Sequence, residues 1–166
     1  MSEPGEILWR PGAAPDRPTA VGRFVEWLAA ERGLGFESYD ALWRWSIDEL
    51  EAFWAAIWDF YGVRASTPYE QVLASREMPG ARWFAGARLN YAEHALSGVQ
   101  RLERTAVIAR SQTRAEVRLT FAELREQVAA ARTGLQRLGV TQGDRVVAYM
   151  PNIPETLVAF LSLIHI

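Results

Sequence analysis

The stretch that decides the fold class is TFAELREQVAAARTGLQRLG, residues 120–139. Thr120 and Glu123 have the spacing of a capping box, in which each side chain accepts a hydrogen bond from the other residue's free backbone N–H. Apolar residues then recur at helical spacing as far as Leu138, and Gly139 is a typical stop signal. The run is too short for a coiled coil, so it favours a helix packed on a sheet.

Strand candidates lie on both sides of this helix. Residues 106–110 and 117–119 precede it, and residues 145–150 follow it after a turn at 141–144. A last helix is expected after the prolines of residues 151–154. Because strands and helices alternate with short links, the order predicts a parallel βαβ unit with a right-handed crossover. We therefore expect an α/β fold, with a helical N-terminal region followed by the first βαβα elements of a truncated domain.

The first half of the chain is predicted to be helical. After a proline-rich lead-in, helices are expected over residues 19–32 and 39–45, and a brief helix capped by Asn90 ends at Leu96. Capping boxes at residues 46–49 and 67–70 predict two more helices, which reach Tyr61 and Ser75. Residues 76–89 are expected to form an ordered loop. The predicted buried stripe of the third helix is Ile47, Leu50, Trp54, Ile57 and Tyr61.

Composition excludes several kinds of chemistry. The chain has no cysteine, so disulfides and cysteine-ligated metals are excluded, and it has no lysine to form a Schiff base or to clamp phosphate. All eighteen basic residues are arginine, and a net charge of −2 gives no strong field for nucleic acid or membrane. Five of the seven tryptophans fall between residues 27 and 58, and their helical spacing favours a core over a base-stacking platform. The N-terminus lacks signal-peptide features, so a cytoplasmic location is expected.

The most specific motif is MPGARWFAGARLNYAEH, residues 78–94. It resembles the N-terminal signature of acetoacetyl-CoA synthetases, which belong to the adenylate-forming (AMP-binding) superfamily. The similarity covers about residues 7–160, and it assigns the βαβα elements to the start of an AMP-binding domain. The chain departs from the family at Ala85, where proline is usual, and at residues 162–166, which leave open whether the tail is native. The expected domains are a lead-in (1–18), a helical region (19–97) and an incomplete α/β domain (98–166).

The resemblance implies a two-step ligation. The carboxylate of acetoacetate attacks ATP to give an acyl-adenylate and pyrophosphate, and coenzyme A then displaces AMP. ATP, Mg²⁺ and coenzyme A are the implied cofactors, and acetoacetate and the remainder of the chain are the implied partners. The apolar end of the last helix and the few strands predict a piece of a larger domain. No Gly-rich phosphate loop is visible, so we expect no catalytic residue, no metal ligand and no activity from the fragment alone.

Arginines that flank an aromatic pair are the weak candidates for a cofactor site. Arg82, Trp83 and Arg88 can bind an anionic phosphate, although loop-holding contacts explain the arginines more simply. His94 and His165 lack partners at metal-ligand spacing, so a capping or packing role is expected for His94. Capping is also expected to account for Glu49, Glu70, Glu93 and Glu123.

Two alternatives remain beside an acetoacetate–CoA ligase. One is another short-chain acyl-CoA synthetase, acting on acetate or propionate. The other is a non-catalytic helical module that binds a partner through its aromatic surface. The full-length gene would discriminate between them, because only a synthetase continues into an adenylating core.

Overall fold

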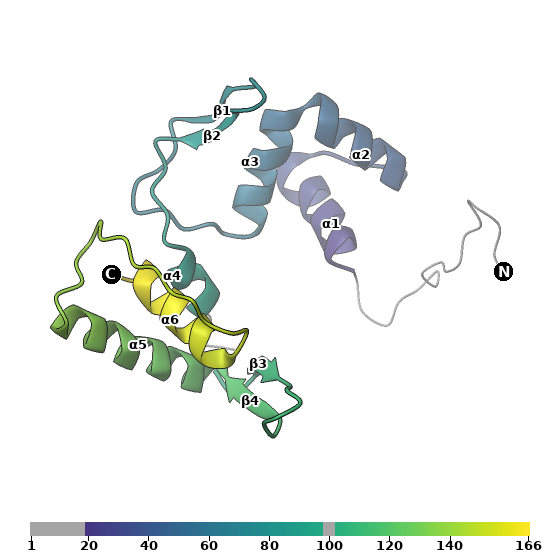
Figure 1. Cartoon of the computed structure of the whole chain (residues 1–166). Helices are drawn as coiled ribbons and strands as arrows, with labels where there is room; N and C mark the ends of the chain where they lie inside the picture. The colour runs from purple at the N-terminus through teal and green to yellow at the C-terminus, as the bar shows by residue number, and fades with distance from the viewer. Residues whose placement is uncertain (1–18, 98–101) are drawn as a thin grey trace. The chain divides into compact units, whose positions relative to one another are not determined.

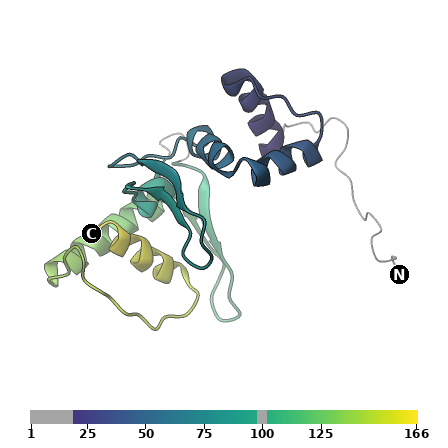
Figure 2. The same cartoon turned by 90° about the horizontal axis from the view of Figure 1, so that it is seen from above.

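The computed structural model describes residues 19–97 and 102–166, which fall into two compact units. The first unit contains residues 19–63 and 69–86, and the second contains the described parts of 64–68 and 87–166. Figures 1 and 2 show the elements of each. Six helices and two small antiparallel sheets are present in the described residues, which confirms the α/β class.

Helix α1 (Ala20–Arg32) forms as predicted. The Thr19 side chain accepts a hydrogen bond from the Gly22 N–H at 3.0 Å, and the helix ends at Gly33, whose φ of 66° lies in the left-handed region. Phe24 and Leu28 on this helix are buried. They form the first unit's core with residues from the next two helices, namely Leu42 and Ala56, against which Trp27, Trp45, Phe53, Ile57 and Phe60 pack.

Helices α2 (Tyr39–Asp48) and α3 (Leu50–Phe60) follow α1. The capping box predicted at residues 46–49 is wrong, because Ser46 lies inside α2, where its hydroxyl donates to the Trp43 carbonyl at 2.7 Å. Helix α3 starts after Glu49 with no side-chain cap. The two helices are thus separated at Glu49, although no capping box forms there.

The predicted stripe on α3 is wrong in part. Ile57 packs on the core, but Ile47, Trp54 and Tyr61 are exposed. The predicted stripe begins at Ile47, but Ile47 belongs to α2. The helical spacing counted from Ile47 therefore does not apply to α3. The tryptophans divide accordingly: Trp27 and Trp45 pack on the core, whereas Trp43 and Trp54 are exposed, so the prediction of a plain core holds only for some of them.

A β-hairpin completes the first unit. Strand β1 (Gln71–Ser75) pairs antiparallel with β2 (Arg82–Ala85), with Leu73 opposite Trp83. The helix predicted from residues 67–70 is therefore wrong, and so is the loop prediction for the residues of β2. A capping box is a local signal, and here pairing with β2 supplies partners for the β1 backbone and buries Leu73.

The second unit contains α4 (Tyr91–Leu96), α5 (Phe121–Arg137) and α6 (Pro154–Ile164). The capping box of α5 forms as predicted: the Thr120 N–H donates to the Glu123 carboxylate at 2.7 Å, and the Glu123 N–H donates to Thr120 Oγ1 at 3.2 Å. Helices α5 and α6 lie side by side (Figure 1). The buried core residues of this unit are Ala92, Leu96, Leu124, Val128, Val158 and Leu161.

Strands β3 (Thr105–Ala109) and β4 (Val117–Thr120) confirm two predicted strands, but they pair with each other as an antiparallel hairpin. Residues 145–150 form no strand, and Val147 is 94% exposed. The parallel βαβ pairing is thus absent from the described residues. A strand needs a neighbour's backbone groups, and no described strand lies beside residues 145–150. None of the described helices has the length and apolarity to cross a membrane.

Candidate functional site

The 78–94 motif is organised around Phe84 on β2. Its ring centroid lies 4.6 Å from that of Trp58 on α3 and 5.3 Å from that of Tyr69. The φ of Phe84 is 46°, a left-handed conformation that an aromatic residue rarely adopts. The aromatic contacts with Trp58 and Tyr69 hold the ring in place and therefore offset the cost of this backbone.

The corner after Phe84 requires a glycine. Gly86 has a φ of 88°, and a Cβ there would come within 3.2 Å of Glu70 Cγ. The Glu70 N–H donates to the Ala85 carbonyl at 2.8 Å, so the two segments approach closely. Glu70 therefore packs against the motif and does not cap a helix, which corrects its predicted role.

The three candidate cofactor-binding residues do not form one described site. Arg82 and Trp83 belong to the first unit and Arg88 to the second. Trp83 is 40% exposed and packs edge-to-face on Trp54, with ring centroids 5.6 Å apart. The Arg88 backbone N–H donates to the Thr67 carbonyl at 3.0 Å, so its main chain holds the loop.

The guanidinium groups of Arg82 and Arg88 are exposed. Neither has a hydrogen-bond or ion-pair partner within the described ranges 19–97 and 102–166. The loop-holding side-chain contacts that offered the simpler explanation are thus not seen in this part of the chain. The role of these arginines in binding an anion stays a prediction.

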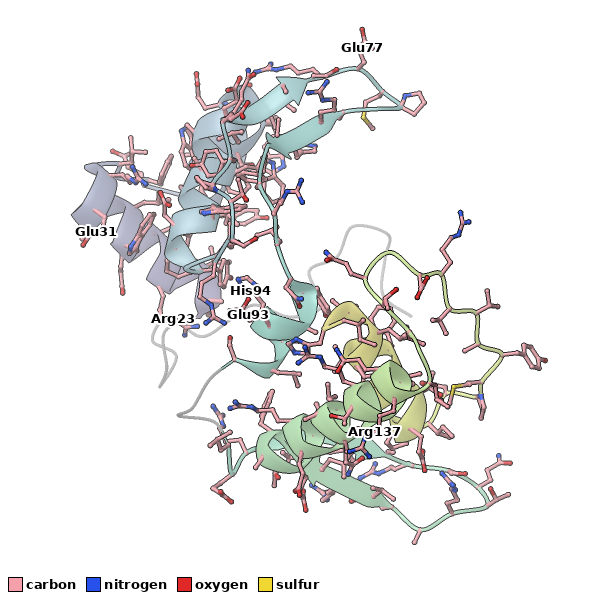
Figure 3. The ribbon with its side chains drawn as sticks, turned by 90° about the vertical axis from the view of Figure 1, so that its left-hand side faces the viewer. Arg23, Glu31, Glu77, Glu93, His94 and Arg137 are labelled. Carbon is pink, nitrogen blue, oxygen red and sulfur yellow. The ribbon has the colours of Figure 1, made fainter. Side chains whose placement is uncertain are left out.

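A polar junction that sequence reasoning missed surrounds α4. Figure 3 labels His94 and Glu93, which lie on α4. The Arg64 N–H donates to His94 Nε2 at 2.8 Å, and His94 Nδ1 lies 3.2 Å from the Asn90 carbonyl oxygen. With Nε2 as acceptor, the ring proton belongs on Nδ1, where it can reach that carbonyl. The Arg64 guanidinium lies 3.5 Å from the Glu93 carboxylate. His94 thus has a structural role, as predicted.

Distance along the chain explains why this junction was missed. Arg64 and His94 are 30 residues apart, and no local pattern links them. Asn90 does cap α4 as predicted, because its Oδ1 accepts from the Glu93 N–H at 3.0 Å. Glu93, however, uses its carboxylate for the ion pair with Arg64, and Glu49 caps nothing, so the predicted caps at these two glutamates are wrong.

The described residues do not provide the ligands of a metal centre. Within the described ranges, no group of three or more His, Asp or Glu side chains could hold a metal ion. Hydrogen bonds from Arg110 and then Arg118 hold the pKa of the Glu116 carboxyl below its ordinary value. All three side chains belong to an ion-pair group at the β3–β4 hairpin, which explains that shift structurally. No step of a reaction is therefore assigned to ATP or Mg²⁺ on these residues.

Comparisons with known proteins match almost the whole chain. The model of the acetyl-coenzyme A synthetase N-terminus matches residues 39–95, and that of AMP-binding enzymes matches residues 95–166. The chain is 37% identical over 160 residues to the acetoacetyl-CoA synthetase of Danio rerio, and 35% identical over 161 residues to that of Macaca fascicularis. Each alignment covers 95% of this chain and 23% of the relative. The chain thus spans about a quarter of the length of these curated relatives.

A solved structure gives the same result in three dimensions. The acetoacetyl-CoA synthetase from Streptomyces lividans is 48% identical, with a TM-score of 0.76, over 84% of this chain and 22% of that one. The two proteins are therefore similar in sequence as well as in fold. The chain is therefore a homologue of the acetoacetyl-CoA synthetases and matches their N-terminal part, and its residues 95–166 match AMP-binding enzymes.

Proposed function

We propose that this chain is the N-terminal part of an acetoacetate–CoA ligase. The whole enzyme would convert ATP, acetoacetate and coenzyme A to acetoacetyl-CoA, AMP and diphosphate through an acyl-adenylate. The observation that carries this proposal is the similarity to acetoacetyl-CoA synthetases over 95% of the chain. In this proposal residues 19–97 are the helical acyl-CoA-synthetase region, preceded by a lead-in at 1–18, and residues 98–166 begin the AMP-binding domain.

The proposed contribution of these residues is a scaffold and not the chemistry. Attack of a carboxylate on the α-phosphate of ATP, with pyrophosphate leaving, brings anions together and needs cationic and hydrogen-bonding groups that stabilise developing negative charge. This sequence has no lysine and no Gly-rich phosphate loop for that purpose. ATP, Mg²⁺ and coenzyme A would be held by the remainder of the protein, with Arg82, Trp83 and Arg88 as candidates for an additional anion contact. The whole protein would act on a small molecule in the cytoplasm.

A pyrophosphate-release assay tests this proposal. The protein encoded by the full gene is given ATP, Mg²⁺ and coenzyme A with acetoacetate, acetate or propionate in parallel. Acetoacetate is expected to give the highest kcat/KM, and the 166-residue chain alone is expected to release no pyrophosphate. Turnover by the 166-residue chain, or an inactive full-length protein, would contradict the proposal.

The second candidate substrate is acetate. The observation that favours it is the match of residues 39–95 to the model of the acetyl-coenzyme A synthetase N-terminus. Acid specificity decides between them as a ratio of kcat/KM values. A ratio that favours acetate or propionate over acetoacetate would select the alternative and leave the ligase chemistry intact.

A further inference from the structure

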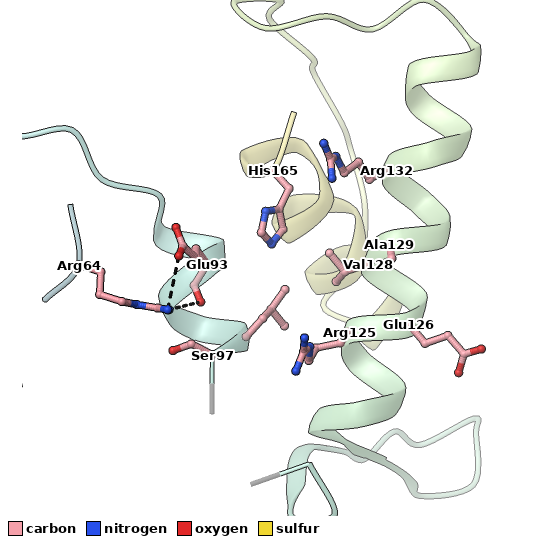
Figure 4. Close-up of a pocket in the computed structure, with 10 residues that line it drawn as sticks. Arg64, Glu93, Ser97, Arg125, Glu126, Val128, Ala129, Arg132 and His165 are labelled. Atoms are coloured by element: carbon pink, nitrogen blue, oxygen red, sulfur yellow. Dashed lines mark hydrogen bonds and ion pairs between the residues drawn. The ribbon is translucent and has the colours of Figure 1, made fainter. Parts of the chain in front are cut away.

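A second group of arginines lies in the second unit, around a cavity whose lining holds more arginines than acidic residues. A cavity of about 530 Å³ lies within the second unit and is lined by residues of α4, of α5 and of the segment that follows α6 (Figure 4). Its cationic residues on α5 are Arg125 and Arg132. His165 also lines the cavity, where its ring lies between the two sides (Figure 4).

The helix geometry of α5 places the two arginines together. They are seven residues apart, which corresponds to two helical turns, so both lie on one face about 10 Å apart along the axis. Figure 4 shows both arginine side chains on the cavity side of α5. Glu126 also lines the cavity, but its carboxylate points away from the arginines in Figure 4 and forms no described ion pair with them.

Arg64 and Glu93, which also line the cavity, form an ion pair with each other. This pairing leaves neither group to compensate the arginines of α5. Across residues 19–97 and 102–166, the side chains of Arg125 and Arg132 have no hydrogen-bond or ion-pair partner. Of the three arginines in the lining, two are thus available to an anion.

The cavity wall between the arginines is apolar and fixed. Val128 lies between them on α5 and is 2% exposed, and Leu96 on α4 is also buried. An apolar wall removes water from one side of a bound anion, which strengthens its hydrogen bonds to the guanidinium groups. The planar N–H fork of each arginine suits bidentate contact with phosphate oxygens.

We propose that this cavity binds a small molecule that bears at least two phosphate groups. A single carboxylate has only two acceptor oxygens, which one guanidinium fork already occupies, so it cannot form bidentate contacts with both arginines. An oligophosphate has acceptor oxygens over a greater length, so both arginines and a ring N–H of His165 can share one ligand. The cavity volume leaves room for such an anion. This proposal does not rest on the ligase reaction.

Calorimetric titration of the 166-residue chain with inorganic pyrophosphate tests the proposal. Saturable binding is expected, and it should weaken as salt is added because exposed charges are screened. The double variant Arg125→Gln/Arg132→Gln should weaken binding about tenfold or more, since two charge-assisted contacts are lost. Arg137→Gln is the matched control, because Arg137 lies on the same helix outside the cavity lining, and it should bind like the parent.

A second variant separates charge from geometry. Arg125→Lys/Arg132→Lys keeps both positive charges but loses the forks, so its affinity should fall between the parent and the glutamine variant. Circular dichroism should be unchanged in all variants, because the substituted side chains are exposed. Absence of saturable binding, or equal loss in Arg137→Gln, would overturn the site. Equally tight, arginine-dependent binding of citrate would overturn the assignment to phosphate.

Discussion

Phe84 shows how one residue in the motif depends on its surroundings. The ring is held by Trp58 and Tyr69 while the backbone stays in the left-handed region. Two terms of opposite sign therefore meet at one position: favourable aromatic packing and an unfavourable φ. A pair of substitutions can separate them, because alanine and glycine both remove the ring but only glycine tolerates positive φ.

Phe84→Ala should lower the free energy of unfolding by about 2–3 kcal/mol, less than a fully buried phenylalanine because the ring is half-buried. Phe84→Gly should be more stable than Phe84→Ala by about 1 kcal/mol, the reverse of the usual order in a strand. Urea denaturation measures both, and Met78→Ala, at a residue that is 85% exposed, is the control. If the alanine variant proved the more stable, the left-handed conformation of Phe84 would be refuted.

Glu123 gives the α5 capping box a pH dependence. Hydrogen bonds from the Thr120 N–H and then its hydroxyl hold the pKa of Glu123 below the ordinary value of 4.5. Because the pKa is lowered in the folded state, the carboxylate stabilises the chain above about pH 4.5 and loses that contribution as pH falls through the folded value. Glu123→Gln should therefore lower the Tm at pH 7, and its difference from the parent should shrink as pH falls below about 4.5. Glu126→Gln, on the same helix, should leave the Tm nearly unchanged throughout, and a Tm gap for Glu123→Gln that does not shrink as pH falls would argue against the box.

At the scale of elements, local sequence signals succeeded where no tertiary partner competed with them. The box at 120–123 and the Asn90 cap begin helices, and Gly33 ends one, because the caps satisfy backbone groups within a few residues. The box at 67–70 failed because β1 gains a pairing partner in β2, for example Leu73 opposite Trp83. The cavity on α5 could not be predicted, since it depends on how α4 and α6 pack against that helix.

The contact between α5 and α6 should carry much of the second unit's stability. Leu124 is 4% exposed and lies in the core that joins α4, α5 and α6. Leu124→Ala should lower the free energy of unfolding by about 2–4 kcal/mol through lost burial and a cavity. Leu138→Ala removes the same atoms at a position 83% exposed and should change it by less than about 0.5 kcal/mol. Similar losses for the two variants in urea denaturation would contradict this packing.

At the scale of the whole molecule, the family and the α/β class could be predicted from the 78–94 motif and the element order. The predicted parallel sheet is absent from the described structure, where residues 145–150 have no strand beside them. Their run of Val146, Val147 and Tyr149 is exposed, as unpaired strand residues would be. The candidate site was predicted only as single residues, since its arginines fall in two units.

Amide hydrogen exchange tests the proposed place of residues 145–150. In the 166-residue chain the amides of Val146 to Tyr149 should exchange rapidly, because they have no described backbone partner. In the longer protein their exchange should be slower by about 100-fold or more, because strand pairing protects them. The amides within α5 serve as the internal control. Equal rates at residues 146–149 in both proteins would exclude a strand there.

Detection of the acyl-adenylate tests the central claim most directly. The longer protein is mixed with ATP, Mg²⁺ and acetoacetate without coenzyme A, and the enzyme-bound products of a single turnover are analysed by mass spectrometry. We predict acetoacetyl-adenylate together with one equivalent of pyrophosphate. The control is a protein that still binds ATP or still activates another acid. If such a protein formed no adenylate with acetoacetate, the assignment as an acetoacetate–CoA ligase would be contradicted.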